Sequence, residues 1–178
     1  MRAGRPVPTR HYDRAMKLAA LRHDGRLDMD DLLAREVARL QAEGRRVRGL
    51  LMDWPDGDRV CGAMLLRDVS GGETYLVSQD LGPGATGCRV DPHGFARASE
   101  VLRRALAETP APDLVVVNRF GGLEAGGEGL LDELSALLAA DVPVLTAVAD
   151  KHAAAWAAFS GDWPLLAPEA LPDWLSSL

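Results

Sequence analysis

Two glycine-rich stretches, each with one arginine, contain the residues of this chain best suited to bind a ligand. The first, LGPGATGCR at residues 81–89, combines three glycines with a hydroxyl group and a guanidinium group. Turns of this kind expose backbone N–H groups that can hold an oxyanion, and arginine adds a planar fork that fits a tetrahedral anion. The alternative is a surface turn with a solvated arginine, in which the cysteine is a small core residue. The candidate ligand-binding residues of this stretch are Gly82, Gly84, Thr86, Gly87, Cys88 and Arg89.

The second stretch, NRFGGLEAGGEG at residues 118–129, has five glycines in twelve residues and follows the apolar segment DLVVVN. An apolar strand that ends in polar residues is typical of a central parallel strand whose carboxyl end meets a ligand. Asn118 can donate an amide N–H to an anion and Arg119 can neutralise it from the loop, so both are candidates together with Gly121 and Gly122. Glu124 is expected to cap the loop or to orient Arg119. The alternative is that the glycines only allow a tight turn from strand to helix.

A third stretch, RHDGRLDM at residues 22–29, stands where a phosphate-binding P-loop would join a strand to a helix. It lacks the second glycine and the lysine of the pattern G-x-x-x-x-G-K-S/T. Asp28 falls near the lysine position, where its carboxylate suits a helix start but repels a β- or γ-phosphate. The nearby Asp30 and Asp31 have the same explanation as capping residues, with a divalent cation site as the minor alternative. His23 is a further candidate ligand contact.

The remaining residues give no sign of metal or covalent chemistry. The four histidines have no metal-ligand spacing, so no metal site is predicted. No serine stands in the context of an activated nucleophile, so no catalytic residue is assigned. The sequence does not identify a cofactor.

Alternating patterns predict the elements that position these loops. Strands are expected at 17–21, 47–53, 113–118 and 142–148, and a hairpin from 59–69 and 73–81. Helices are expected to follow Asp28 and to cover 93–108, 129–141 and 151–159, the first burying Leu32, Leu33, Val37 and Leu40. The predicted fold is a three-layer α/β sandwich with a mainly parallel sheet, a central strand at 113–118, and both glycine-rich loops on one edge. The apolar hairpin segment CGAMLL favours strand pairing in a homodimer.

Composition limits the partners and the domain organisation. The chain has 178 residues and a net charge of −6, which argues against binding to nucleic-acid phosphates. No apolar run is long enough for a membrane span, and two cysteines without a signal segment favour a cytoplasmic location. Residues 16–178 are predicted to form one domain, preceded by a flexible basic arm at 1–15.

The stretches DLVVVNRFGGLEAGGEGLLDEL, PVLTAV, AWAAFSGD and LGPGATGCRVDP resemble a bacterial family known only as a domain of unknown function. The resemblance covers roughly residues 16–168. It implies a link to molybdenum, because genes of that family often lie beside genes for molybdenum uptake or molybdenum enzymes, and its members are sometimes labelled as ATP-binding molybdenum transport components.

A more distant resemblance is to the cancer-related nucleoside-triphosphatase family of P-loop proteins. The segment VRGLLMD and the hairpin after it look like the strand and hairpin insertion of that family. Asn118 and Arg119 stand where that family has an Asp-Glu pair, and Glu124 matches its following glutamate. The resemblance therefore implies a degenerate P-loop scaffold without the lysine and without the carboxylate that helps to hold Mg²⁺.

Two classes of function follow from these observations. The favoured one is a non-catalytic binding or accessory protein for a small anionic ligand, either phosphate-like or molybdate, the latter suggested by the resemblance alone. The alternative is a nucleotide-binding NTPase or phosphotransferase with non-standard phosphate-binding residues. A protein-interaction role is a third possibility. Enzymatic activity is left open, with the missing charged residues favouring a protein that is not an enzyme.

Overall fold

The computed structural model describes residues 17–59, 62–79, 90–161 and 163–178. The predicted basic arm at 1–15 lies outside these ranges. So do six candidate ligand-binding residues of the first glycine-rich stretch, namely Gly82, Gly84, Thr86, Gly87, Cys88 and Arg89.

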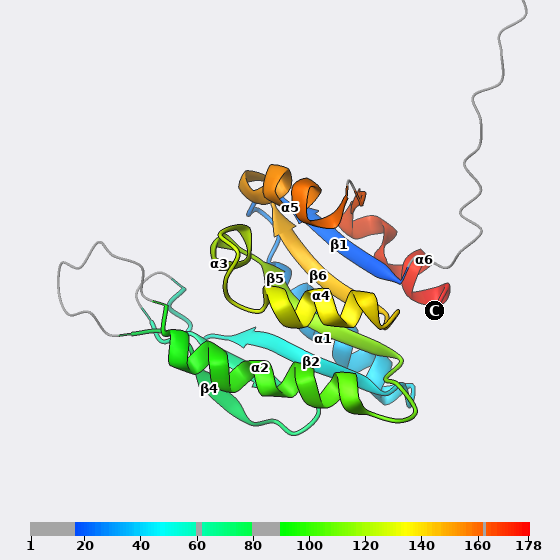
Figure 1. Cartoon of the computed structure of the whole chain (residues 1–178), viewed down its shortest axis with the longest axis horizontal. Helices are drawn as coiled ribbons and strands as arrows, with labels where there is room; N and C mark the ends of the chain where they lie inside the picture. The colour runs from blue at the N-terminus through cyan, green and yellow to red at the C-terminus, as the bar shows by residue number, and fades with distance from the viewer. Residues whose placement is uncertain (1–16, 60–61, 80–89, 162) are drawn as a thin grey trace, which may run out of the picture.

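A seven-stranded sheet forms the middle layer, in the order β4-β3-β2-β5-β6-β1-β7 (Figure 1). Five neighbouring strands are parallel: β2 (Val47–Asp53), β5 (Leu114–Phe120), β6 (Val144–Ala149), β1 (Leu18–His23) and β7 (Leu165–Leu166). The hairpin strands β3 (Leu65–Asp68) and β4 (Thr74–Leu76) extend the sheet in the antiparallel sense. The predicted mainly parallel sheet, its antiparallel hairpin and its central strand are confirmed.

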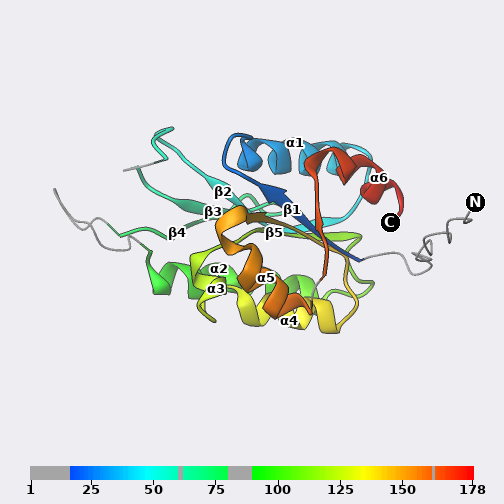
Figure 2. The same cartoon turned by 90° about the horizontal axis from the view of Figure 1, so that it is seen from above.

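Helices cover both faces of the sheet and complete the three predicted layers (Figure 2). One face carries α1 (Met29–Ala42) and α6 (Leu171–Ser176). The opposite face carries α2 (Pro92–Ala107), α3 (Gly122–Ala125), α4 (Leu131–Ala139) and α5 (Ala153–Ser160). Two short 3-10 turns, η1 (Asp150–His152) and η2 (Pro168–Ala170), precede α5 and α6. None of the helices in the described ranges combines the length and the apolar character needed to cross a membrane.

The central strand is apolar because both of its faces are covered. Val115 and Val117 belong to the core beneath α2, α4 and α5, whereas Leu114 and Val116 belong to the core beneath α1 and α6. All four side chains are buried, as the unbroken apolar run predicts for a strand between two helical layers.

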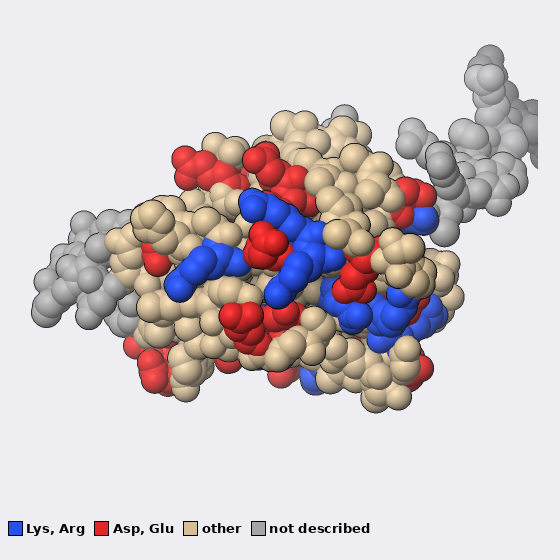
Figure 3. All heavy atoms as spheres, turned by 60° about the horizontal axis from the view of Figure 1, so that its bottom comes forward, with Lys and Arg blue, Asp and Glu red and all other residues tan. Residues whose placement is uncertain are grey.

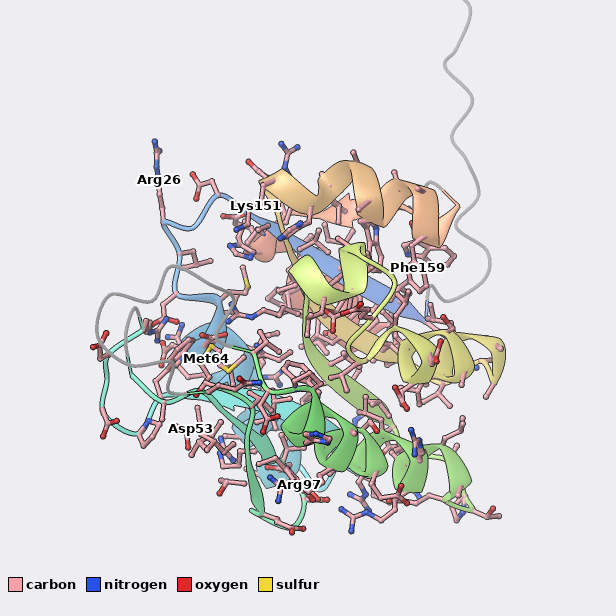
Figure 4. All side chains as sticks on the ribbon, turned by 60° about the vertical axis from the view of Figure 1, so that its left-hand side comes forward. Arg26, Asp53, Met64, Arg97, Lys151 and Phe159 are labelled. Carbon is pink, nitrogen blue, oxygen red and sulfur yellow. The ribbon has the colours of Figure 1, made fainter. Side chains whose placement is uncertain are left out.

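Aromatic side chains fix α5 against the sheet. Trp156 is 1% exposed and meets Phe120 edge to face, with ring centroids 5.3 Å apart. Phe159 lies one helical turn further on and contacts both rings; Figure 4 shows it pointing from α5 toward the body of the molecule. The i, i+3 spacing of Trp156 and Phe159 puts both rings on the same face of the helix.

Helix α1 begins where the sequence predicts. The Asp28 side chain caps it by accepting a hydrogen bond of 3.0 Å from the Asp31 backbone N–H. Leu33, Val37 and Leu40 are buried as expected. The sequence also predicts a buried Leu32, but this side chain is only half-buried and packs against the outside of the core beneath α1.

The expectation of a pairing edge in CGAMLL does not hold for the two leucines of that segment. Its leucines, Leu65 and Leu66, belong to β3, which is bonded to β2 on one side and to β4 on the other. The outer edge of the hairpin is the three-residue strand β4, which is too short to present a long template to a second copy. The hairpin therefore gives no support to the predicted homodimer.

Charged side chains of both signs are mixed on the surface. On the face shown in Figure 3, Lys and Arg side chains alternate with Asp and Glu. Several arginines are held in ion pairs, such as Arg48 with Glu108 and Arg103 with Glu133. Paired charges of this kind offer no continuous basic track to a nucleic-acid backbone among the described residues of that face.

Candidate ligand-binding site

The carboxyl ends of the parallel strands meet the start of α1, and polar side chains gather there. β1 runs to His23 and β5 runs to Phe120, so both strands are longer than the sequence predicts. His23 and Arg119 are consequently fixed at strand ends, which corrects the expectation that Arg119 lies in a loop. The carboxyl edge of such a sheet is where open α/β folds bind ligands.

Asp30, in the first turn of α1, is the centre of this group. Its Oδ1 accepts a bond of 2.6 Å from Arg119 Nη2 and one of 3.3 Å from Asn118 Nδ2. Its Oδ2 accepts a bond of 3.0 Å from the Trp54 indole N–H. The residue is only 9% exposed, so its charge is balanced by partners and not by water. Asn118 and Arg119, which are predicted to bind an anion, thus bind the Asp30 carboxylate, an anion that belongs to the chain itself.

A second ion pair lies beside the first. Arg59 donates to both carboxylate oxygens of Asp28, at 2.9 and 2.7 Å, and its Nη1 lies 3.7 Å from Asp30 Oδ2. The hydrogen bonds from Arg59, followed by the one from the Asp31 backbone, hold the pKa of Asp28 below its usual value. Two guanidinium groups therefore face two carboxylates, Asp28 and Asp30, and the charges of these four side chains cancel.

His23 contributes a neutral imidazole to the same region. Burial, and next the positive charge of Arg119, lower its pKa, while the carboxylates of Asp150 and Asp30 oppose the shift. Its Nδ1 atom is buried and has no hydrogen-bond partner among the described residues. A neutral ring with a free nitrogen can donate or accept one hydrogen bond from a ligand.

We expect His23 to make the protein less stable in mild acid. The pKa of His23 is lower in the folded than in the unfolded chain, so the unfolded chain binds more protons as the pH falls below about 6.5. The free energy of unfolding should therefore fall between about pH 7 and pH 5.5, and His23→Gln should make this fall smaller. Urea unfolding across this range measures the effect. An unchanged pH dependence in His23→Gln would contradict the assignment.

The second glycine-rich stretch is a short helix held by one carboxylate. Glu124 Oε2 accepts from the Gly121 backbone N–H at 2.9 Å, and Oε1 accepts from the Leu130 N–H at 3.0 Å. The expected loop-capping role of Glu124 is confirmed, and both of its oxygens are occupied. The sequence pattern predicts an open loop here and gives no sign of α3, because four helical residues are too few to show a periodicity.

Two cavities adjoin the Asp30 group. The larger, about 490 Å³, is lined by Asn118, Arg119, Gly121 and Gly122 together with apolar residues of β2, β3 and α2. The smaller, about 230 Å³, is lined by residues from the end of β1 to the start of α1, namely His23, Gly25, Leu27, Met29 and Asp30, together with Trp54, Arg59, Asn118, Arg119 and Ala147. Asn118, Arg119 and Trp54 line both cavities.

The structure thus brings together five predicted ligand-binding residues around two adjoining cavities: His23, Asn118, Arg119, Gly121 and Gly122. The other six predicted residues lie outside the described ranges. The residue that follows them, Val90, lines the larger cavity together with Gly121. Among the described residues, no group of three or more His, Cys, Asp or Glu side chains is arranged to hold a metal ion.

Sequence reasoning missed the roles of Asp30, Trp54 and Arg59. In the sequence Asp30 is one of three equivalent helix-start carboxylates, and only its burial distinguishes it from Asp28 and Asp31. One signal was available: Asp30 stands one turn before the buried Leu33, and so on the inner side of the helix.

Three comparisons place the chain among known proteins. The model of a family described as "Protein of unknown function (DUF2478)" matches residues 18–174. The molybdenum import ATP-binding protein ModC 2 of Bradyrhizobium diazoefficiens is 38% identical over 146 residues, which are 82% of this chain but only 16% of that protein. The solution structure of a human cancer-related nucleoside triphosphatase superposes with a TM-score of 0.67 at 19% identity, covering 89% of this chain and 95% of that one. The last similarity confirms the predicted P-loop-like fold.

Proposed function

The chain belongs to the family described as "Protein of unknown function (DUF2478)", and from this premise we propose that it is a non-catalytic binding protein for a small oxyanion, with molybdate as the first candidate. Molybdate is suggested by the name of the relative from Bradyrhizobium diazoefficiens, of which this chain spans 16%. The proposed role is that of an accessory protein of molybdenum handling.

One observation carries this proposal. Asn118 and Arg119 already bind an anionic group, the carboxylate of Asp30, at the start of α1. The donors that an oxyanion needs are therefore present and directed to one point at the carboxyl edge of the sheet. Within the described part of the chain, Arg119 contacts Asp30 through Nη2, so the other N–H groups of its guanidinium remain available to a ligand that approaches from the cavity side.

The charge balance of the site calls for a further cation. The described residues Arg59, Arg119, Asp28 and Asp30 sum to zero, so a doubly charged oxyanion needs additional positive charge close by. Arg89 is the candidate for this cation, because Val90, the next residue in the sequence, lines the same cavity as Arg119. The proposal assigns that charge to Arg89.

The same carboxylates speak against a triphosphate. In a P-loop the helix start presents free backbone N–H groups and a lysine to the phosphates. Here the Asp31 backbone N–H already donates a hydrogen bond to the Asp28 side chain. Asp30 adds a buried negative charge in the first turn of the helix. The alternative, a nucleotide-binding NTPase or phosphotransferase, has its support in the name of the ATP-binding relative and in the fold.

We expect the purified protein to bind no ATP–Mg²⁺ in the micromolar range and to release no phosphate from it. The reason is that Asp28 and Asp30 already balance the charges of Arg59 and Arg119, and no lysine stands in the 22–29 turn to hold the β- and γ-phosphates. Calorimetric titrations with ATP–Mg²⁺ and with molybdate, run in parallel, measure both affinities.

Each outcome of these titrations separates the two functions. Molybdate binding without nucleotide binding supports the oxyanion proposal. Micromolar ATP–Mg²⁺ binding that is lost in a variant of the 22–29 turn would establish the alternative. If neither ligand binds, the proposal fails and a protein-interaction role becomes the leading explanation.

A further inference from the structure

The larger cavity offers more volume and more apolar wall than a bare oxyanion bound at Arg119 would use. Its volume of about 490 Å³ falls within the range of about 300–1,000 Å³ found for sites that hold organic ligands. Its walls include the apolar side chains of Met52, Met64, Leu66, Val77, Phe95 and Leu130. Figure 4 shows Met64 on the inner side of the hairpin, close to the amino-terminal end of α2.

Among the described residues that line this cavity, Asn118, Arg119 and Glu124 carry polar side chains that could face a ligand. Asn118 is 3% exposed, and because its Nδ2 donates to Asp30, its Oδ1 is left buried without a partner among the described residues. Burial of an amide oxygen without a hydrogen bond costs free energy, so a ligand that donates a hydrogen bond to this atom would be favoured. The free N–H groups of Arg119 call for an acceptor at the adjoining position.

The third polar residue in the wall does not compete for a ligand. Both oxygens of Glu124 accept backbone N–H groups, from Gly121 and from Leu130. Two neighbouring lining residues therefore have hydrogen-bonding groups without a partner among the described residues. These groups are one acceptor, Asn118 Oδ1, and the remaining N–H donors of Arg119.

We propose that this cavity binds a flat, largely apolar ring system that carries an N–H donor beside a carbonyl oxygen, as in a cyclic amide. The ring N–H would donate to Asn118 Oδ1, the carbonyl would accept from Arg119, and the rings would pack against the methionines and Phe95. The inference does not depend on the oxyanion proposal, because it uses the apolar cavity and the unpaired amide oxygen, which a bare oxyanion leaves unused.

Three small probes test the proposal: 2-quinolone, its N-methyl derivative and quinoline. The first has both the N–H and the carbonyl, the second lacks the N–H, and the third lacks the carbonyl and has no N–H. Titration followed by ¹H–¹⁵N spectra reports the site directly, since Trp54 lines the cavity and its indole N–H signal can be assigned with a Trp54→Phe variant. We expect 2-quinolone to bind and both analogues to bind at least roughly tenfold more weakly.

Variants that fill the cavity provide a second measurement. Met64→Trp and Leu123→Trp reduce the volume from two different walls, so at least one folded variant is expected, and each should weaken 2-quinolone binding by more than about tenfold. Leu106→Trp is the matched control, because Leu106 is 36% exposed on α2 and does not line this cavity.

The outcomes are decisive in both directions. Equal affinity for 2-quinolone and its N-methyl derivative, unchanged affinity in a folded cavity-filling variant, or no binding of 2-quinolone to wild type would each overturn the proposal. Molybdate titrations in the absence of 2-quinolone test the oxyanion proposal separately, so failure of one proposal does not imply failure of the other.

Discussion

Replacing Asp30 by asparagine is expected to destabilise the protein by about 2–3 kcal/mol in a buffer free of oxyanions. The change keeps the size of the side chain and removes its charge, so the Arg119 guanidinium loses the carboxylate that it contacts at 2.6 Å. The side chain of Asp30 is only 10% exposed, which makes the loss larger than for a surface ion pair. Because the Arg119 side chain is 42% exposed, water recovers part of the loss, and we expect a value at or below the lower end for fully buried pairs.

The same variant should regain stability when an oxyanion is added. In Asp30→Asn the amide fills the same space and its oxygen can still accept a hydrogen bond, but the charge of Arg119 is no longer balanced, so sulfate or molybdate that approaches the other N–H groups of Arg119 should bind more tightly than in wild type. A ligand that binds only the folded state stabilises it by RT ln(1 + [L]/Kd), so the unfolding temperature of Asp30→Asn should rise with anion concentration more steeply than that of wild type.

Asp31→Asn is the matched control for Asp30→Asn. Asp31 stands in the same helical turn, but its side chain is 59% exposed and pairs with Arg35 at the surface. We expect this substitution to change the free energy of unfolding by less than about 0.5 kcal/mol and to leave the anion response of wild type. Equal responses of the two variants to sulfate would show that the Asp30 carboxylate does not occupy an anion position.

Replacing either Arg89 or Arg119 by alanine is expected to weaken oxyanion binding by about ten- to a hundredfold. The basis is that one charge-assisted hydrogen bond contributes roughly 1.5–3 kcal/mol, and the chain has no lysine between Lys17 and Lys151 to replace the lost charge. Titration calorimetry with molybdate, tungstate, sulfate and phosphate measures the change in both variants.

Arg119→Ala needs a folding control that the sequence alone does not indicate. Arg119 lies at the end of β5 and forms an ion pair with Asp30. Its loss removes a positive charge from beside the buried Asp30 carboxylate, which keeps its hydrogen bonds from Asn118 and Trp54. Circular dichroism should therefore accompany each titration, and Arg119→Lys should restore the charge but only part of the affinity.

Arg26→Ala provides a matched arginine control for these titrations. Figure 4 shows Arg26 extending away from the body of the molecule, and its side chain is 92% exposed. Its removal should leave oxyanion affinity unchanged. Unchanged affinity in both Arg89→Ala and Arg119→Ala, with intact circular dichroism, would place the anion elsewhere.

The architecture could be predicted because it depends on patterns within short segments. The run of valines in β5 indicates a strand with two covered faces, and Asp28 marks the start of α1 through its own side chain. The ends of strands were less accessible, since β1 and β5 continue to His23 and Phe120 through pairing with β6 and not through an unbroken apolar run of their own.

The candidate site could be predicted only in part, because its decisive contacts join residues far apart in the sequence. Arg119 and Asp30 are 89 positions apart, and Arg59 and Asp28 are 31 apart. Residue types indicated that Asn118 and Arg119 would bind an anion, but no local pattern could show that Asp30 supplies one. Burial distinguishes Asp30 from its neighbours, and burial follows from the packing of α1 on the sheet.

The place of β1 in the sheet has a consequence for the order of folding. β1 is the first strand along the chain, yet its two neighbours, β6 and β7, are among the last, and Trp163 Nε1 donates to the Leu18 carbonyl across 145 positions. During synthesis the residues up to β6 must therefore leave the ribosome before β1 finds either of these partners. Contacts of such long range slow folding and leave an apolar nascent segment unpaired in the meantime. We expect this chain to fold late and to depend on chaperones more than a protein of the same size built from sequential hairpins.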